Sequence, residues 1–188
     1  MPVHARKLAP GLLALALLGS TVLAAEPVNI LSNGGFEDGL TGWTAQAGQT
    51  LVSDASECHS GKACLTGEVT KPTQALTLVG KIRVKAGNRY TFETWARATG
   101  GTKLVLWVVQ PGAKNRQMVN AFEKVASRWK RYTAPLSVQG DGLLELHVVA
   151  PSSHAAPVGQ IWIDDLAVYE TKMPAVASVT EGQEGFND

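Results

Sequence analysis

Hydrophobic and polar side chains alternate along most of the chain between Val28 and Glu170, which is the pattern of strands with one buried face. Turn-forming pairs that contain Gly, Pro, Asn or Asp interrupt the alternation at intervals typical of sandwiches and barrels. Segment 116–126 is ambiguous, because its apolar spacing also fits a short helix. The pattern predicts an all-β protein with strands at 50–53, 62–67, 73–79, 81–85, 89–98, 102–110, 128–137, 142–150 and 159–169.

The two ends of the chain depart from this pattern. Residues 1–24 are predicted to be a cleavable secretory signal, because two basic residues precede a short apolar run. Small residues then precede the point where the sequence changes abruptly from apolar to polar. That run is shorter than the roughly 20 residues of a membrane span, so we expect a secreted or periplasmic protein without a span, an uncleaved anchor being the alternative. One domain is expected over 26–170, followed by a flexible acidic tail over 171–188.

Length and charge exclude some classes of function. A chain of 188 residues, once its leader is removed, can bury one core of ordinary size. The 17 basic and 16 acidic residues are scattered along the chain, and the net charge is +1. Nucleic acid is therefore not an expected partner, because there is no basic patch to meet a phosphate backbone.

The two cysteines favour a disulfide. Cys58 and Cys64 flank a short turn that contains Gly61, and in an oxidising compartment such a pair can close a hairpin. A zinc site would need a fourth ligand besides these two sulfurs and His59. A nucleophilic cysteine is the least favoured alternative.

Charged and aromatic side chains are expected on the faces of several strands that point away from the core. An aromatic ring beside hydrogen-bonding charged groups suits a sugar, whose C–H face stacks on the ring while its hydroxyls find polar partners. The candidate ligand-binding residues are Glu93, Trp95, Arg97, Trp107, Glu145 and His147.

A plainer interpretation of these residues stays open. In that case the two tryptophans are partly exposed sheet aromatics, and Glu93 and Arg97 form an ordinary ion pair. The other three tryptophans, Trp43, Trp129 and Trp162, are expected to pack as structural residues.

An acidic residue falls on the expected core face of the last strand. Alternation places Trp162, Asp164, Leu166 and Val168 together on that face. A buried carboxylate needs a cation, a basic side chain or several amide donors. Calcium would serve, with Glu37 as a second ligand if the first and last strands pair, and capping by backbone amides explains the residue equally well.

Several short motifs together resemble a known family. They are Asn33-Gly34-Gly35-Phe36-Glu37 with Gly39-Leu40 and Gly42-Trp43, then His59-Ser60-Gly61-Lys62, Tyr90-Thr91-Phe92, Trp129 to Thr133, and Ile163-Asp164-Asp165-Leu166. In this order they resemble the carbohydrate-binding modules of families four, nine and twenty-two. The resemblance implies an antiparallel β-sandwich jelly roll over essentially the whole predicted domain.

The resemblance also implies a metal and a binding face. A structural calcium would be held by Glu37, by Asp164 and by the backbone of the turn from Ser60 to Lys62. The sugar cleft of the family lies on the concave sheet, where we expect all six candidate ligand-binding residues. The identity of the sugar does not follow from the resemblance.

We therefore expect a secreted, non-catalytic protein that binds a poly- or oligosaccharide through Trp95 and Trp107 on the concave sheet. A glycosidase or an envelope protein is a possible partner. The alternatives are a protein-interaction or envelope structural module on the same fold, and a glycoside hydrolase or lyase. The enzyme alternative would use Glu93 and Glu145 as paired carboxylates, whose separation decides whether it is permissible.

Overall fold

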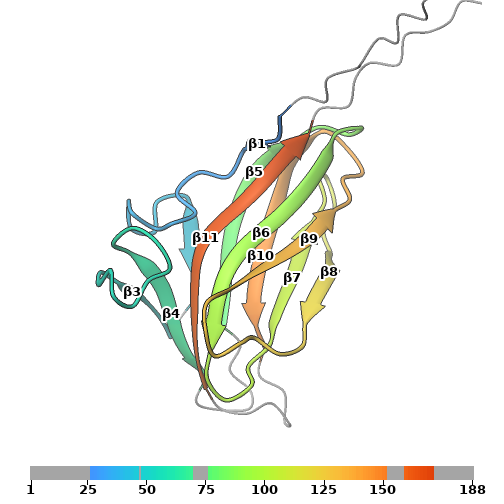
Figure 1. Cartoon of the computed structure of the whole chain (residues 1–188). Coiled ribbons are helices and arrows are strands. Elements are labelled where there is room, and N and C mark those ends of the chain that lie inside the picture. The colour runs from blue at the N-terminus through green and yellow to red at the C-terminus, as the bar shows by residue number, and fades with distance from the viewer. Residues whose placement is uncertain (1–25, 47, 70–75, 152–158, 172–188) are drawn as a thin grey trace, which may run out of the picture.

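The computed structural model describes residues 26–46, 48–69, 76–151 and 159–171. Within these ranges the chain forms an antiparallel β-sandwich, as expected, and Figure 1 shows its two sheets as two layers. The predicted signal over 1–24 lies outside the described residues, as does the predicted tail from residue 172 onward. No helix in the described ranges has the length and apolar character that crossing a membrane requires.

The first sheet, called the β11 sheet after its central strand, has the order β3-β4-β11-β6-β9, with β1 paired to β11. The second, the β10 sheet, has the order β2-β5-β10-β7-β8. The strands of the β11 sheet are β1 (Val28–Asn29), β3 (Gln49–Val52), β4 (Cys64–Val69), β6 (Arg89–Ala98), β9 (Lys130–Leu136) and β11 (Gly159–Thr171). Those of the β10 sheet are β2 (Trp43–Ala45), β5 (Leu76–Val84), β7 (Leu104–Val109), β8 (Arg116–Phe122) and β10 (Gly142–Ala150).

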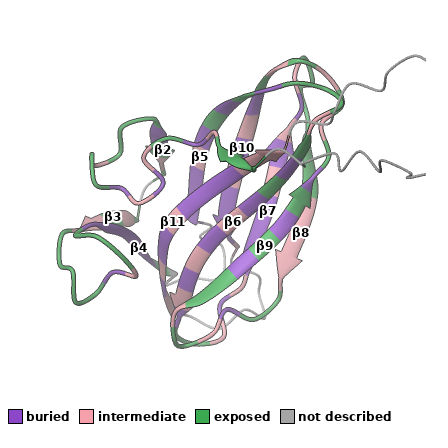
Figure 2. Cartoon of the chain, turned by 45° about the horizontal axis from the view of Figure 1, so that its top comes forward, coloured by how far each residue is buried: buried purple, intermediate pink, exposed green. Residues whose placement is uncertain are grey.

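Alternation along the strands builds the core, as the burial colours along β6 show in Figure 2. Phe92 on β6 and Leu146 on β10 are fully buried and belong to one hydrophobic cluster. Burial of side chains of this size contributes roughly 1.5–3 kcal/mol each to the free energy of unfolding. Trp43 joins this cluster as expected, and its ring lies against Gly80, where a β-carbon would meet it.

Two strand predictions differ from the structure. The predicted strands 73–79 and 81–85 are one continuous strand, β5, which pairs with β10 along its whole length. The ambiguous segment 116–126 contains strand β8 and no helix. Pairing with β7 decides its conformation, because β7 would otherwise be an unpaired edge.

The expected core face of β11 is right for Leu166 and Val168 but wrong for Trp162, because a bulge between them shifts the alternation. The register with β6 changes between Asp164 and Ala167, and Asp165 has a positive φ of 48°. Ile163 faces the core before the bulge, and Leu166 faces it afterwards. Trp162 therefore shares neither a face nor the core with Leu166, and it lies half-buried on the outer side of the sheet.

Candidate functional site

The six candidate ligand-binding residues do not share a surface. Three of them, Glu93, Trp95 and Arg97, lie on β6, which belongs to the β11 sheet. The other three, Trp107 on β7 with Glu145 and His147 on β10, belong to the β10 sheet. The expectation of one common sheet is wrong, because alternation tells which side of a strand a residue occupies but not which sheet the strand joins.

The outer face of the β10 sheet carries an aromatic row next to a charged row. His147 lies directly opposite Trp107 on one neighbouring strand and Val79 on the other. Two residues along β10, Glu145 lies opposite Lys81. We call this the Trp107 surface, and its members are Lys81, Trp107, Arg116, Met118, Glu145 and His147.

Glu145 is the charged centre of the Trp107 surface. Lys81 Nζ lies 2.9 Å from Glu145 Oε1. This hydrogen bond lowers the pKa of Glu145 below its usual value, and the positive charge of Lys81 acts in the same direction. The Glu145 carboxylate is therefore ionised at neutral pH, which leaves it able to accept hydrogen bonds.

His147 has unmet hydrogen-bonding capacity. Its Nε2 lies 3.4 Å from Glu145 Oε2, but neither ring nitrogen makes a hydrogen bond within the described chain, although both are shielded from water. A buried polar atom without a partner costs roughly 1–3 kcal/mol. Because water does not reach these two nitrogens, a sugar hydroxyl does not reach them in this conformation either.

Apolar and cationic side chains border Trp107. Met118 lies opposite it on β8 and is 59% exposed. The Arg116 guanidinium carbon lies 5.8 Å from the centre of the Trp107 ring. The half-buried ring thus lies between an exposed thioether and a cation.

On the outer face of the β11 sheet, by contrast, the aromatic rings contact other protein groups. Arg97 lies over Trp162, with its guanidinium carbon 4.0 Å from the ring centre, and 5.5 Å from that of Trp129. It also forms an ion pair with Glu57. Trp129 and Trp162 therefore pack, as expected, but around this arginine and not in the core.

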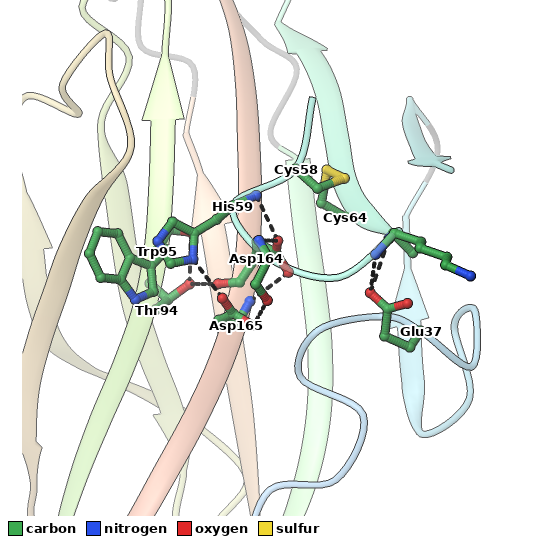
Figure 3. A network of polar contacts seen from close by, with 11 residues as sticks. Glu37, Cys58, His59, Cys64, Thr94, Trp95, Asp164 and Asp165 are labelled. Atoms are coloured by element: carbon green, nitrogen blue, oxygen red, sulfur yellow. Dashed lines mark hydrogen bonds and ion pairs between the residues drawn. A yellow bond between two sulfur atoms is a disulfide. The ribbon is translucent and has the colours of Figure 1, made fainter. Parts of the chain in front are cut away.

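Trp95 stacks on a loop residue, as Figure 3 shows. The His59 ring lies 3.8 Å from the Trp95 ring, centre to centre, with 15° between their planes. One face of Trp95 is therefore covered. A hollow of about 530 Å³ remains beside Trp95 and Glu93, and Glu37 and Asp165 also line it.

The geometry does not support the proposed pair of catalytic carboxylates. Glu93 and Glu145 point outward from different sheets, so the thickness of the sandwich separates them. Packed sheets are about 10 Å apart, and both side chains extend beyond that distance. The pair cannot flank one glycosidic bond, which needs carboxylates within about 10 Å of each other.

The predicted disulfide between Cys58 and Cys64 is present. It closes the loop that carries His59 and lies beside Asp164 (Figure 3). Both sulfurs are occupied by this bond, so the pair cannot serve as the thiolate ligands of a zinc ion.

Asp164 is fully buried beneath that loop and accepts three backbone hydrogen bonds. His59 N and Ser60 N donate to Oδ2 over 3.0 and 3.1 Å, and Asp165 N donates to Oδ1 over 2.8 Å. Burial raises the pKa of Asp164 to about 6, against the lowering effect of these amide donors. The amide capping that the sequence left open is thus present.

Glu37 caps the same loop from its other end. Lys62 N and Ala63 N donate to Glu37 Oε1 over 2.8 and 3.0 Å (Figure 3). The first and last strands do pair, β1 with β11, which is the condition for placing Glu37 near Asp164. Two distant carboxylates, Glu37 and Asp164, therefore hold one disulfide-closed loop.

Sequence reasoning missed several members of these clusters. Lys81 lay at the break between two predicted strands, and Arg116 and Met118 lay in the segment that also fitted a helix. If the sequence had been interpreted as one continuous strand, its alternation would have predicted that Lys81 points outward. Nothing in the sequence pairs Glu57 with Arg97, because the contact depends on how the loop folds back over β6.

Comparison with known proteins gives the following similarities. The family model described as carbohydrate binding domain matches residues 28–153. Among solved structures, TmCBM61 in complex with beta-1,4-galactotriose has a TM-score of 0.58 at 20% identity, covering 75% of this chain and 97% of that one. The CBM22-1 xylan-binding domain of Xyn10C from Paenibacillus barcinonensis has a TM-score of 0.56 at 22% identity, covering 80% and 99%.

A third structure, that of a CBM4, has a TM-score of 0.55 at 18% identity, and the match covers 72% of this chain and 99% of that one. At such identities the likeness to solved structures shows the fold, which is the expected jelly-roll sandwich. No curated protein matches the chain.

Proposed function

Because this chain belongs to the family of carbohydrate binding domains, we propose that it is a secreted, non-catalytic protein that binds an oligo- or polysaccharide on its Trp107 surface. Trp107 is the stacking platform in this proposal. Glu145 accepts hydrogen bonds from the sugar hydroxyls, and His147 flanks the platform opposite Trp107.

The observation that carries the proposal is the half-buried ring of Trp107 on the same outer face as the ionised carboxylate of Glu145, with His147 between them on β10. A sugar ring offers an apolar face and several hydroxyls at once. Stacking on Trp107 would bring those hydroxyls toward the ionised Glu145, which accepts hydrogen bonds but cannot donate them. A purely apolar ligand would use only half of this surface.

The β11 sheet offers less to a ligand. His59 covers one face of Trp95, and Arg97 is held between two tryptophans and Glu57. We infer that Trp95 and Arg97 hold the loop over the sheet, and that Trp95 contributes little to sugar binding.

Titration of the protein with oligosaccharides tests the proposal. Oligomers of β-1,4-galactan, β-glucan and xylan should perturb the tryptophan fluorescence, while monosaccharides should do so weakly, because one ring contact recovers little of the cost of association. Calorimetry gives the affinity for each oligomer. If a broad glycan array gave no binder, the proposal would be wrong.

A protein-binding function on the same surface is the second candidate. Met118 and Leu143, which are 59% and 53% exposed, lie on this outer face and would suit an apolar partner. A glycosidase or an envelope protein would be such a partner. Substitution of Met118 by Gln should abolish capture of a protein partner, whereas glycan affinity should depend on Trp107.

Calcium remains a proposal for the loop that Glu37 and Asp164 hold. The donor set fits in type, because Asp164 is a fully buried carboxylate and Glu37 supplies a second carboxylate to the same loop, and both offer oxygen ligands that calcium prefers. Glu37, Asp164 and the backbone between Ser60 and Lys62 would hold the ion. Its role would be structural, since it would tie the loop to β11.

A further inference from the structure

The Trp107 surface carries an excess of positive charge at one end, and this bears on which sugar it binds. Arg83 lies opposite Leu143 in the row next to Lys81 and Glu145. Arg116 lies opposite Val109 in the row of Glu145. Lys81 is neutralised by Glu145, which leaves the two arginines as the uncompensated charges of this face.

Neither arginine has an acidic partner within the described chain. Arg116 contacts only the Trp107 ring among the interactions found there, and Arg83 forms no ion pair. Asp141, two residues before Leu143 in the sequence, accepts a hydrogen bond from Ala86 N. The forked donors of both guanidinium groups therefore remain available to a ligand.

We propose that the Trp107 surface binds an acidic glycan, one whose sugar units carry carboxylate groups, with Arg83 and Arg116 as the carboxylate-binding residues. This rests on the proposed function, because it assigns a ligand class to the same surface. One sugar ring stacks on Trp107, and uronate carboxylates along the chain meet the guanidinium forks, which match a carboxylate with two parallel hydrogen bonds.

The spacing of the two arginines suits a chain and not a single sugar. Arg83 is on β5 and Arg116 on β8, so three strand spacings of about 4.8 Å separate them across the sheet. Their rows are also two residues apart along the strands, so the backbone separation is about 16 Å, and Glu145 lies between the two arginines in the row of Arg116. A neutral or hydroxyl-bearing unit fits at Glu145, where a carboxylate would be repelled.

The test compares each acidic oligosaccharide with its neutral counterpart. Glucuronate-bearing xylo-oligosaccharides and oligogalacturonates are measured by calorimetry, together with the same chains after reduction of their carboxylates to hydroxymethyl groups. We expect the acidic form to bind about five- to tenfold more tightly at low salt. The preference should shrink as salt rises, since exposed charges are screened.

Variants assign the preference to the arginines. Arg83→Gln and Arg116→Gln should each lower the ratio of acidic to neutral affinity, and together they should bring it to about one. Lys103→Gln is the matched control, because Lys103 pairs with Glu123 away from this row and should leave the ratio unchanged.

The outcomes separate the two proposals. Equal binding of acidic and reduced chains overturns the acidic-glycan inference and leaves sugar binding in place. A preference that survives both arginine substitutions overturns it too. If neither form binds, sugar binding on this surface is wrong, and the acidic-glycan inference fails with it.

Discussion

Trp95 and Trp107 point away from each other, because their strands, β6 and β7, follow one another in the chain but belong to opposite sheets. Each ring is half-buried on an outer face of the sandwich. One is covered by His59, and the other lies beside Arg116 and Met118. The two tryptophans therefore make a matched pair of variants, identical in residue type and both half-buried but different in surroundings.

Trp107→Ala should weaken the binding of the best oligosaccharide by about 1–3 kcal/mol, the range for truncating an aromatic contact in a binding site. Trp95→Ala should leave this affinity unchanged and lower the melting temperature, because it removes the stacking partner of His59. Calorimetry measures the first effect and a thermal melt the second. The reverse result, with binding lost only in Trp95→Ala, would move the site to the β11 sheet.

The disulfide should contribute measurably to stability. Replacing Cys58 and Cys64 by Ser should lower the free energy of unfolding by about 2–3 kcal/mol, since the closed loop is short and constrains the unfolded chain modestly. Urea unfolding measures the change. A reductant should destabilise the wild type and not the double variant, and two free thiols in the native protein would contradict the assignment.

Asp164 should make stability depend on pH in a direction that reveals whether calcium is bound. Burial raises its pKa to about 6 from 3.8, so the folded state keeps a proton that the unfolded state has lost between these values. Stability should therefore be full below about pH 4 and fall as pH rises through 6, by about 3 kcal/mol in all. Asp164→Asn should remove this dependence, as melts across the pH range will show.

Bound calcium would reverse that trend. It would hold the Asp164 carboxylate ionised, so stability would rise with pH over the same range, and a chelator would lower the melting temperature. Glu37→Gln should abolish the response to chelator. A chelator-insensitive melt with the acid-stabilised profile would leave amide capping as the sole role of Asp164.

Gly34 should tolerate no side chain. A β-carbon there would coincide with the carbonyl oxygen of Leu166 and approach its nitrogen to 3.1 Å, and backbone atoms cannot rotate away. Gly34→Ala should cost at least the roughly 1–3 kcal/mol of ordinary overpacking, because it also pushes apart the hydrogen bond from Leu166 N to Gly34 O. Gly140→Ala is the control, since nothing lies within 4 Å of its β-carbon. Chemical unfolding of both variants gives the comparison.

The sequence predicted single strands better than it predicted their assembly. The bounds of β6 and β10 and their core-facing residues follow from alternation alone. The division of Trp95 and Trp107 between the two sheets could not be predicted in this way, because the sheet that a strand joins depends on hydrogen bonding to residues far along the chain. The same is true of Glu57 and Arg97, whose contact depends on where the disulfide loop folds.

The bulge at Asp164 and Asp165 has a consequence for how this chain can change. The bulge adds one residue to β11 relative to β6, so each later side chain of β11 points to the face opposite to the one that strict alternation from Ile163 would give it. Deleting Asp165 would remove the extra residue and leave Leu166 opposite Thr94, so Leu166 and Val168 would still face the core of a regular strand. That deletion would instead cost the contacts of Asp165 with His59 and Ser60. The bulge thus lets β11 carry an additional side chain for the loop without changing which later residues face the core.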